Sequence, residues 1–217
     1  MRVTDAVNYR KSIRAFLDKP VESQVLEELL IKAARAPSGG NVQPWRVYVV
    51  NGPAMMRFRD FRDSRKAPEN AAYEIYPQGL TEPYRSSRFK VGEDMYRLLG
   101  IPREDRGARI RRLMENYNFF GAPAAIFCFV DKQMGPPQWS DLGMFLQTFM
   151  LLATEAGLDT CAQEAWAARP DTVAEFVGAP PEQMLFCGVA IGFQDPAAPV
   201  NSLVSEREPL SGFATFL

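Results

Sequence analysis

The ten residues Ala36-Pro37-Ser38-Gly39-Gly40-Asn41-Val42-Gln43-Pro44-Trp45 separate a helical pattern from a strand pattern. Two prolines stiffen this segment, and two glycines allow the backbone to approach a flat ligand closely. Ser38, Asn41 and Gln43 add hydroxyl and amide groups that suit the edge of a heterocycle. The pattern predicts a ligand-binding loop; the alternative is a packed loop around a core tryptophan.

The patterns around this loop predict layers of helix and strand. A helical repeat of apolar residues precedes it, from Val25 to Ala34, and Pro37 ends that helix. Three apolar runs predict buried strands, at residues 47–50, 124–130 and 185–193. Further helices are expected from Thr4 toward Ser12, over 142–156 with Gly157 as the stop, and from Asp171, and residues 212–217 are expected to form a fourth strand or an arm.

This alternation favours an α+β (α/β layered) fold. The 217 residues contain no internal repeat and no linker, so we expect one domain over residues 1–217. Lys and Arg number 25 against 26 Asp and Glu, which leaves no basic field for nucleic acid. The apolar stretch 142–156 is shorter than the roughly 20 residues of a membrane span, so no membrane partner is expected.

Histidine is absent from the chain. A Ser–His–Asp triad, a Cys–His pair and a His-based zinc site are therefore excluded. Cys128, Cys161 and Cys187 are widely spaced, so neither a disulfide framework nor a metal site is predicted. The N-terminus carries no apolar targeting segment, and a reducing cytoplasm is the expected location.

Residues 54–115 are polar with weak periodicity. Five arginines, at positions 103, 106, 109, 111 and 112, have helical spacing, with Glu104, Asp105 and Glu115 among them. This spacing predicts a solvated helix face, with an anion site as the alternative.

Arg10-Lys11-Ser12-Ile13-Arg14 places three cations and a hydroxyl in five residues at the end of a predicted helix. Arg10 and Arg14 share one face if that helix persists. Guanidinium groups bind phosphate in a bidentate manner, and Ser12 adds a donor. The alternative is that these cations only complement the helix dipole.

Taken together, the Arg-x-Ser-x-Arg motif and the stretch APSGGNVQPWRVYVV resemble the FMN-dependent, oxygen-insensitive nitroreductase family. Four further segments match its pattern in order, and the resemblance covers nearly the whole chain. These segments are residues 118–123, 157–165, 188–192 and 205–210.

The resemblance implies a nitroreductase-like fold, with a central, mostly antiparallel sheet flanked by helices. It also implies an intertwined homodimer that exchanges C-terminal strands and holds two FMN molecules at the subunit interface. Helix 142–156 and the C-terminal tail would then lie in that interface.

The family pattern also assigns residue roles. Arg10, Ser12 and Arg207 should hold the FMN phosphate, with Lys11 or Arg14 nearby; Ser205 stands where many members have a basic residue. Four residues of the partner chain should line the flavin: Pro37, Ser38, Gly39 and Asn41. The stretch Ala162, Gln163, Glu164 and Ala165 should pass the isoalloxazine. Arg85 and Arg88 fall near the pyrimidine edge, where a cation stabilises reduced flavin, and Arg88 is favoured.

Aromatic and cationic side chains in the polar segment suggest the substrate side. Tyr76 and Tyr84 suit stacking on a flat acceptor, and Arg85 suits a carboxylate or nitro group. We therefore expect a small aromatic acceptor, with preference for an anionic nitroaromatic such as a nitrobenzoate. The alternative is that the tyrosines pack against the core and the arginines serve only the flavin.

The implied reaction is ping-pong: NADH or NADPH delivers hydride, and a nitroaromatic or quinone then takes two electrons. No catalytic side chain or proton donor stands out. Alternatives on the same scaffold are reductive dehalogenation, ene reduction and flavin fragmentation. Others are a flavin-binding carrier or sensor without turnover, and a flavin-free interaction protein.

Overall fold

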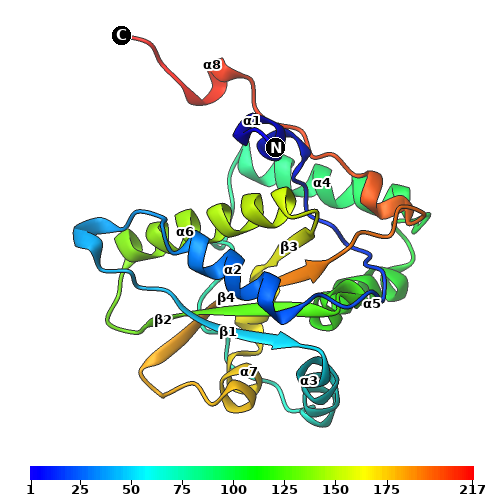
Figure 1. Cartoon of the computed structure of the whole chain (residues 1–217). Coiled ribbons are helices and arrows are strands. Elements are labelled where there is room, and N and C mark those ends of the chain that lie inside the picture. Colours follow the sequence, from blue (N-terminus) through cyan, green and yellow to red (C-terminus); the bar gives the residue numbers. More distant parts are fainter.

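Four antiparallel strands form one sheet in the order β1-β2-β4-β3 (Figure 1). The computed structural model describes all 217 residues. The strands are β1 Arg46–Asn51, β2 Ala124–Asp131, β3 Asp159–Gln163 and β4 Gln183–Gly192. β1 and β3 are therefore the two edges of the sheet.

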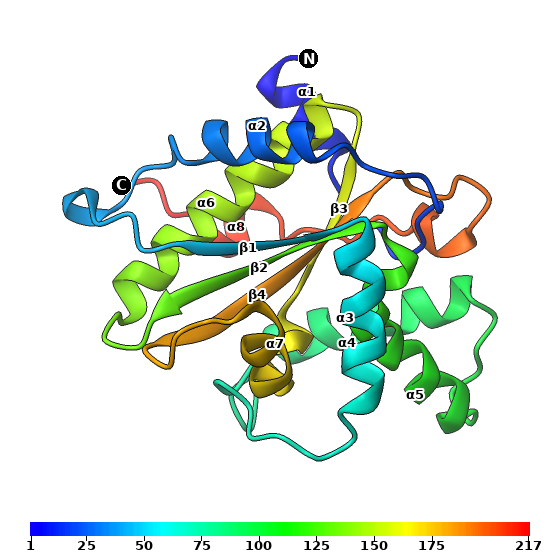
Figure 2. The same ribbon diagram turned by 60° about the horizontal axis from the view of Figure 1, so that its bottom comes forward.

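Helices cover both faces of this sheet. In Figures 1 and 2, α2 and α6 lie on one face, and α3 and α7 lie on the other. The α-helices are α1 Val3–Tyr9, α2 Ser23–Ala33, α3 Pro53–Ser64, α4 Tyr84–Leu98, α5 Arg106–Met114, α6 Pro136–Glu155, α7 Pro170–Val177 and α8 Leu210–Phe213. Short 3-10 helices are η1 Gly39–Asn41, η2 Glu115–Gly121, η3 Glu164–Ala168 and η4 Pro199–Ser202.

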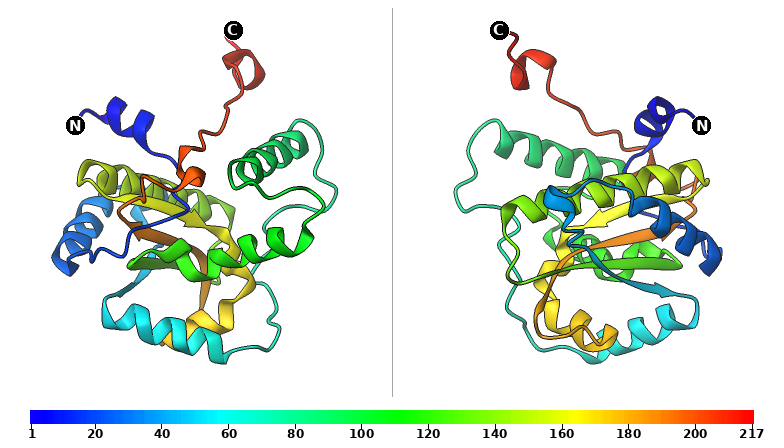
Figure 3. Two further views of the ribbon diagram at one scale, coloured as in Figure 1. Left: turned by 90° about the vertical axis from the view of Figure 1, so that its right-hand side faces the viewer. Right: turned by 60° about the vertical axis from the view of Figure 1, so that its left-hand side comes forward.

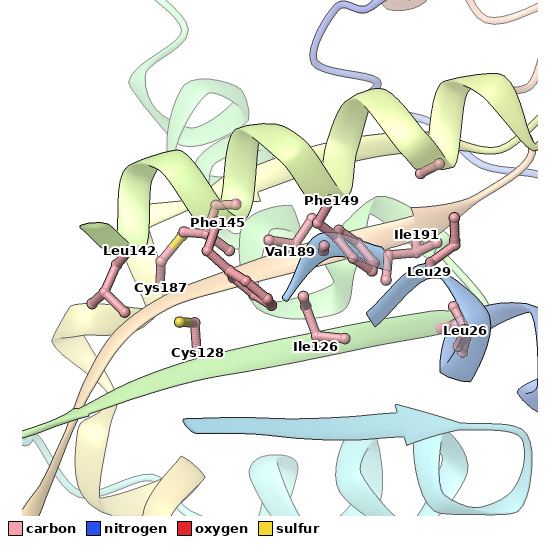
Figure 4. Close-up of a cluster of buried hydrophobic side chains, with 14 of the residues drawn as sticks. Leu26, Leu29, Ile126, Cys128, Leu142, Phe145, Phe149, Cys187, Val189 and Ile191 are labelled. Atoms are coloured by element: carbon pink, nitrogen blue, oxygen red, sulfur yellow. The ribbon is translucent and has the colours of Figure 1, made fainter. Parts of the chain in front are cut away.

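Strand β2 is the centre of the core because both of its faces are apolar. Ile126 and Cys128 point toward α2 and α6, where they meet Phe145 and Phe149 (Figure 4). Phe127 and the other alternate residues enter a second cluster, which includes Phe58, Phe119 and Trp166. The three predicted strands and the helix over 142–156 are confirmed, and that helix begins earlier, at Pro136.

The fourth strand differs from the prediction. It is β3, which follows α6 directly, and residues 212–217 do not join the sheet. They form part of α8 and an extended tail that leads away from the body (Figure 3). The expectation of an arm is therefore correct for the single chain, and that of a fourth strand there is wrong.

The N-terminal helix also ends earlier than expected. It stops at Tyr9, and the chain then runs extended beside β3, where the N–H of Ile13 donates to the Thr160 carbonyl at 3.0 Å. Ile13 is fully buried by this course. The expectation that Arg10 and Arg14 share a helix face is therefore wrong. In an extended chain every second side chain points to the same side, so Arg10 and Arg14 still face the same way.

Residues 54–115 contain three helices, of which α4 and α5 lie one above the other beside the sheet (Figure 3, left). Arg109 of α5 forms a bidentate ion pair with Glu93 of α4, at 2.5 and 3.1 Å. Arg112 is half-buried and donates to the Arg14 carbonyl at 2.8 Å. The predicted solvated face is therefore wrong for these two arginines, although Arg106 and Arg111 are exposed.

Candidate functional site

Four cationic side chains gather beside the edge strand β3. The hydroxyl of Ser12 lies within hydrogen-bond reach of the Cys161 thiol, and three guanidinium groups act on this thiol electrostatically. These belong to Arg14, Arg112 and Arg10. Burial raises the pKa of this thiol in spite of the cations, so Cys161 stays neutral and does not balance their charge.

Arg207 extends this group from the C-terminal segment. Burial lowers the pKa of Arg10, and the neighbouring Arg207 lowers it further. Ser205 fixes Arg207 in place, because its hydroxyl accepts from the guanidinium at 2.7 Å. The cationic cluster, defined here as Arg10, Arg14, Arg112 and Arg207, therefore comes from three separate parts of the chain.

Negative charge is scarce in the cationic cluster. None of its four guanidinium groups forms an ion pair with a carboxylate in the chain. Burial lowers the pKa of Arg112, Glu115 is the one carboxylate that opposes this shift, and the Nε atom of Arg112 is buried without a hydrogen-bond partner. A surplus of cations, three of them half-buried, with a hydroxyl beside them fits a phosphomonoester dianion.

Lys11 points elsewhere. Its ammonium group donates to the backbone carbonyl of Asn201 in η4. The Asn201 side chain in turn accepts from the Arg14 N–H at 2.9 Å. Lys11 therefore ties the Arg-x-Ser-x-Arg segment to η4 and lies outside the cationic cluster.

The stretch from Ala162 to Ala165 forms the turn from β3 into η3. Ala162 and Glu164 are exposed, whereas Gln163 is buried. The Gln163 amide donates to the Asn116 carbonyl at 2.7 Å, and the Tyr117 hydroxyl donates to the Ala165 carbonyl at 3.2 Å. Helix η2 therefore holds this turn with its exposed side facing outward.

Glu164 has no ion-pair partner at this turn. Partial desolvation by the surrounding protein raises the pKa of its carboxyl. The titratable groups that face it are Tyr73 and Cys187, both neutral when protonated. The turn therefore presents one exposed carboxyl that has no cationic partner.

An aromatic group beside this turn was not predicted from the sequence. The Tyr73 hydroxyl donates to the Phe186 carbonyl, and the Tyr73 ring lies 5.6 Å from that of Trp139. Trp139 and Phe186 also meet edge to face at 6.0 Å. Tyr73 lies in the polar segment 54–115, and its aromatic side chain is the feature of the sequence that could have revealed this group.

A groove of about 1070 Å³ runs between α4 and residues 205–209. The Arg88 guanidinium lies over the Tyr76 ring there, 4.0 Å from its centroid. Arg85 pairs with Glu82 at 2.7 Å. Arg88 and Arg207 are therefore the unpaired cations of this groove, since Lys90 pairs with Asp94 and Glu206. Tyr84 is 62% exposed and lies outside the groove.

The loop Pro37–Asn41 is not brought to the cationic cluster within one chain. The N–H of Gly39 donates to the Asp141 carboxylate at 3.3 Å, near the N-terminus of α6. Ser12, in contrast, bridges to Thr160, just beyond the other end of α6. The loop and the segment 10–14 accordingly lie at opposite ends of the sheet (Figures 1 and 2).

This loop is built to expose its polar groups. Asn41 and Gln43 adopt positive φ angles of 56° and 50°, which are unusual for residues other than glycine. The Ser38 hydroxyl accepts from the Gln43 N–H at 2.9 Å. Trp45 stacks on Phe145 with centroids 5.0 Å apart, so a packed tryptophan and an exposed polar loop occur together.

None of the helices combines the length and apolar character needed to cross a membrane.

Residues 7–193 match the sequence profile described as the Nitroreductase family. The chain belongs to the nitroreductase family. The predicted nitroreductase-like fold is confirmed by this match and by the similarity to solved structures of the family.

Members of the nitroreductase family with assigned activities align over nearly the full chain. The nitrobenzene nitroreductase of Ectopseudomonas oleovorans is 34% identical, over 99% of this chain and 96% of that protein. The 4-nitrobenzoate reductase of Pseudomonas putida is also 34% identical, over 96% and 92%. The solved FMN and NADPH-dependent nitroreductase NfnB of Sphigopyxis sp. strain HMH is 42% identical, with a TM-score of 0.95 over 100% of this chain and 99% of that one.

Proposed function

We propose that this protein reduces nitroaromatic compounds with NADH or NADPH as reductant and FMN as cofactor. Membership of the nitroreductase family makes it an NAD(P)H-dependent FMN oxidoreductase. The observation that carries the proposal in this chain is the cationic cluster beside the exposed turn of β3. It offers a site for a phosphate next to an exposed turn that can border a flat ring.

The proposed roles of the residues follow from this geometry. Three guanidinium groups and a hydroxyl bind the FMN phosphate: Arg10, Arg14, Arg207 and Ser12. The turn Ala162–Ala165 borders the ring, with Gln163 fixed from behind by η2. Bound FMN would supply two-electron transfer between nicotinamide and acceptor, and the chain would position both and limit access of water.

We further propose that the active form is a homodimer. Pro37, Ser38, Gly39 and Asn41 of one chain would then line the flavin held by the other. Two observations support this: the loop exposes its polar groups far from its own cationic cluster, and the C-terminal arm exposes Phe213 and Phe216 at 68% and 83%. Such apolar exposure is typical of a segment that packs on another chain.

For the acceptor we propose an anionic nitroaromatic such as a nitrobenzoate. Arg85 was expected to bind this carboxylate, but it pairs with Glu82, so we assign the role to Arg88, which was expected at the flavin. Arg88 is unpaired and lies over Tyr76 in the groove beside α4, and the Tyr76 ring can stack on the acceptor. The kinship with a 4-nitrobenzoate reductase supports this choice. Reductant and acceptor would use one open site in turn, which gives ping-pong kinetics.

The test is an acceptor panel on FMN-loaded protein. NADH and NADPH are each oxidised in the presence of 4-nitrobenzoate, nitrobenzene, a quinone or no acceptor. We expect acceptor-dependent oxidation, fastest with 4-nitrobenzoate, and parallel double-reciprocal lines. Protein that takes up FMN but oxidises neither reductant above background would instead be a flavin carrier. Protein that binds no FMN would contradict the proposal altogether.

A further inference from the structure

Asp141 is a buried carboxylate on helix α6, outside every motif of the candidate site. Its exposed fraction is 4%, and no cation of the chain forms an ion pair with it. Both carboxylate oxygens accept from one donor, the N–H of Gly39, at 3.3 Å. A buried carboxylate with a single neutral donor is a poor source of stability. Its effect therefore falls on the loop to which Gly39 belongs.

The bond from Gly39 is the one hydrogen bond that ties residues 37–42 to another element of the fold. The other hydrogen bonds of these residues stay within the loop. Ser38 accepts from the N–H groups of Asn41 and Gln43, in both cases at 2.9 Å. The positive φ angles of Asn41 and Gln43 persist only where the surroundings impose them. The internal bonds shape the loop, and the bond from Gly39 fixes where the loop points.

Helix α6 also holds the far end of this loop. Phe145 follows Asp141 by four residues and so lies on the same face of the helix. Its ring stacks on Trp45, with centroids 5.0 Å apart and planes 15° apart. Phe145 itself is buried between α6 and the sheet (Figure 4). Two adjacent turns of α6 therefore fix both ends of the loop, while residues 39–43 between them stay exposed.

We propose that Asp141 is a positioning residue, which sets how the loop Pro37–Asn41 meets the ring of the flavin held by the partner chain. This inference rests on the proposed function and on its homodimer. Asp141 acts through the Gly39 N–H and does not itself touch the cofactor. Its removal should therefore change the binding and the surroundings of the ring, and should not change the contacts of the phosphate.

The test compares FMN with riboflavin, which lacks the phosphate, by quenching of flavin fluorescence. Asp141→Ala removes the acceptor and should weaken the binding of both flavins about five- to tenfold, in equal proportion. Asp141→Asn keeps one accepting oxygen and should weaken both about two- to threefold. Asp131→Asn is the matched control, because Asp131 also accepts a loop N–H, that of Gln133 at 3.0 Å. It should leave both dissociation constants near those of the wild type.

Two further measurements separate positioning from folding. Hydrogen exchange of residues 38–43 in apo protein should be faster in Asp141→Ala, with the rest of the chain unchanged. The visible absorption spectrum of bound FMN should shift toward that of free FMN in the same variant, because the loop no longer borders the ring correctly. Arg10→Ala is the contrasting variant: it should weaken FMN binding but leave riboflavin affinity and the loop exchange near the wild-type values.

Three results would overturn the inference. Wild-type affinity for both flavins in Asp141→Ala would make Asp141 a purely structural residue and leave the proposed function intact. A loss for FMN alone would assign its effect to the phosphate. A wild type that binds neither flavin would overturn the proposed function and the inference together. If Asp141→Ala does not fold, Asp141→Asn decides: wild-type flavin affinity and wild-type exchange of the loop in that variant would contradict the inference.

Discussion

The indole of Trp166 packs directly on the backbone of Gly188. A Cβ atom at position 188 would lie 2.4 Å from Cδ1 and 2.9 Å from Nε1 of this indole. Trp166 is fully buried in η3, immediately after the turn proposed to border the flavin. The absence of a side chain at Gly188 therefore sets how closely η3 approaches β4.

Gly188→Ala should accordingly destabilise the protein by about 1–3 kcal/mol, the usual cost of overpacking a core. Gly92→Ala is the matched control, since no atom lies within 4 Å of its added Cβ and it sits inside helix α4. That change should be neutral or stabilising. Denaturant unfolding measures both, and equal effects would contradict the close approach of Trp166.

The phosphate site gives a prediction about affinity. Arg10→Ala or Arg207→Ala should weaken FMN binding by roughly 1.5–3 kcal/mol, the usual contribution of a charge-assisted hydrogen bond. Arg97→Ala is the control, because Arg97 is exposed and pairs with Asp94 on α4. Fluorescence titration measures the change. Wild-type affinity in both cluster variants would show that the phosphate binds elsewhere.

Assembly gives a prediction about size. We expect a dimer of the 24.4 kDa chain at micromolar concentration and no stable folded monomer. Removal of residues 210–217, which include the exposed Phe213 and Phe216, should raise the dimer dissociation constant. Sedimentation velocity tests both, and a folded, FMN-loaded monomer of the full chain would exclude the dimer.

Arg88 gives a prediction about substrate charge. Arg88→Ala should lower kcat/KM for 4-nitrobenzoate about three- to tenfold and change that for nitrobenzene little, since the groove is open and screening limits the effect. Arg97→Ala is the control, because Arg97 lies on the same helix outside the groove, is exposed and pairs with Asp94. If the wild type has nearly the same kcat/KM for 4-nitrobenzoate and for nitrobenzene, at low and at moderate salt, then no carboxylate is recognised.

Glu164 gives a prediction about pH. Its pKa is raised in the folded protein above the ordinary value of 4.5, so the folded state binds the proton more tightly than the unfolded chain. The free energy of unfolding therefore falls as the pH rises from the pKa of the unfolded chain to the higher pKa of the folded protein, and it stays lower at neutral pH. Glu164→Gln should be more stable than the wild type at pH 7, with the difference closing below pH 4.5.

Unfolding midpoints of apo protein at both pH values measure this effect. Glu27→Gln is the control, because Glu27 is exposed on α2. A difference between Glu164→Gln and the wild type that stays constant with pH would show that the carboxyl is not desolvated.

The sequence predicts best those elements that are buried on every side. Strand β2 shows as a continuous apolar run because both of its faces enter the core. Strand β3, by contrast, is an edge strand with a mixed sequence, Asp159-Thr160-Cys161-Ala162-Gln163, and its pattern does not reveal a strand. Helices α4 and α5 bury no residue and are rich in charged side chains, so no group of core residues marks them in the sequence.

In the candidate site, the sequence likewise predicts residues of a local motif better than residues placed by tertiary packing. Arg10, Ser12 and Arg14 were found because they are adjacent in a motif. Arg112 was named only within the alternative interpretation of the five arginines as an anion site, because its place depends on how α5 packs against the N-terminal segment, which local spacing does not encode. Tyr84 was expected in the substrate groove, but it lies outside it, since a stretch of one helix faces several directions.

The opposite placement of the loop Pro37–Asn41 and the segment Arg10–Arg14 means that each chain holds two unlike halves of a site. In the proposed dimer, an Arg10→Ala chain still contributes an intact loop Pro37–Asn41 to its partner's site. A chain altered at Asn41 still contributes intact phosphate-binding residues. Mixed dimers of two inactive variants would therefore regain one complete site in each dimer, or roughly a quarter of all sites after random exchange. Inheritance of two different defective copies could then leave a cell with measurable activity that neither copy supplies alone.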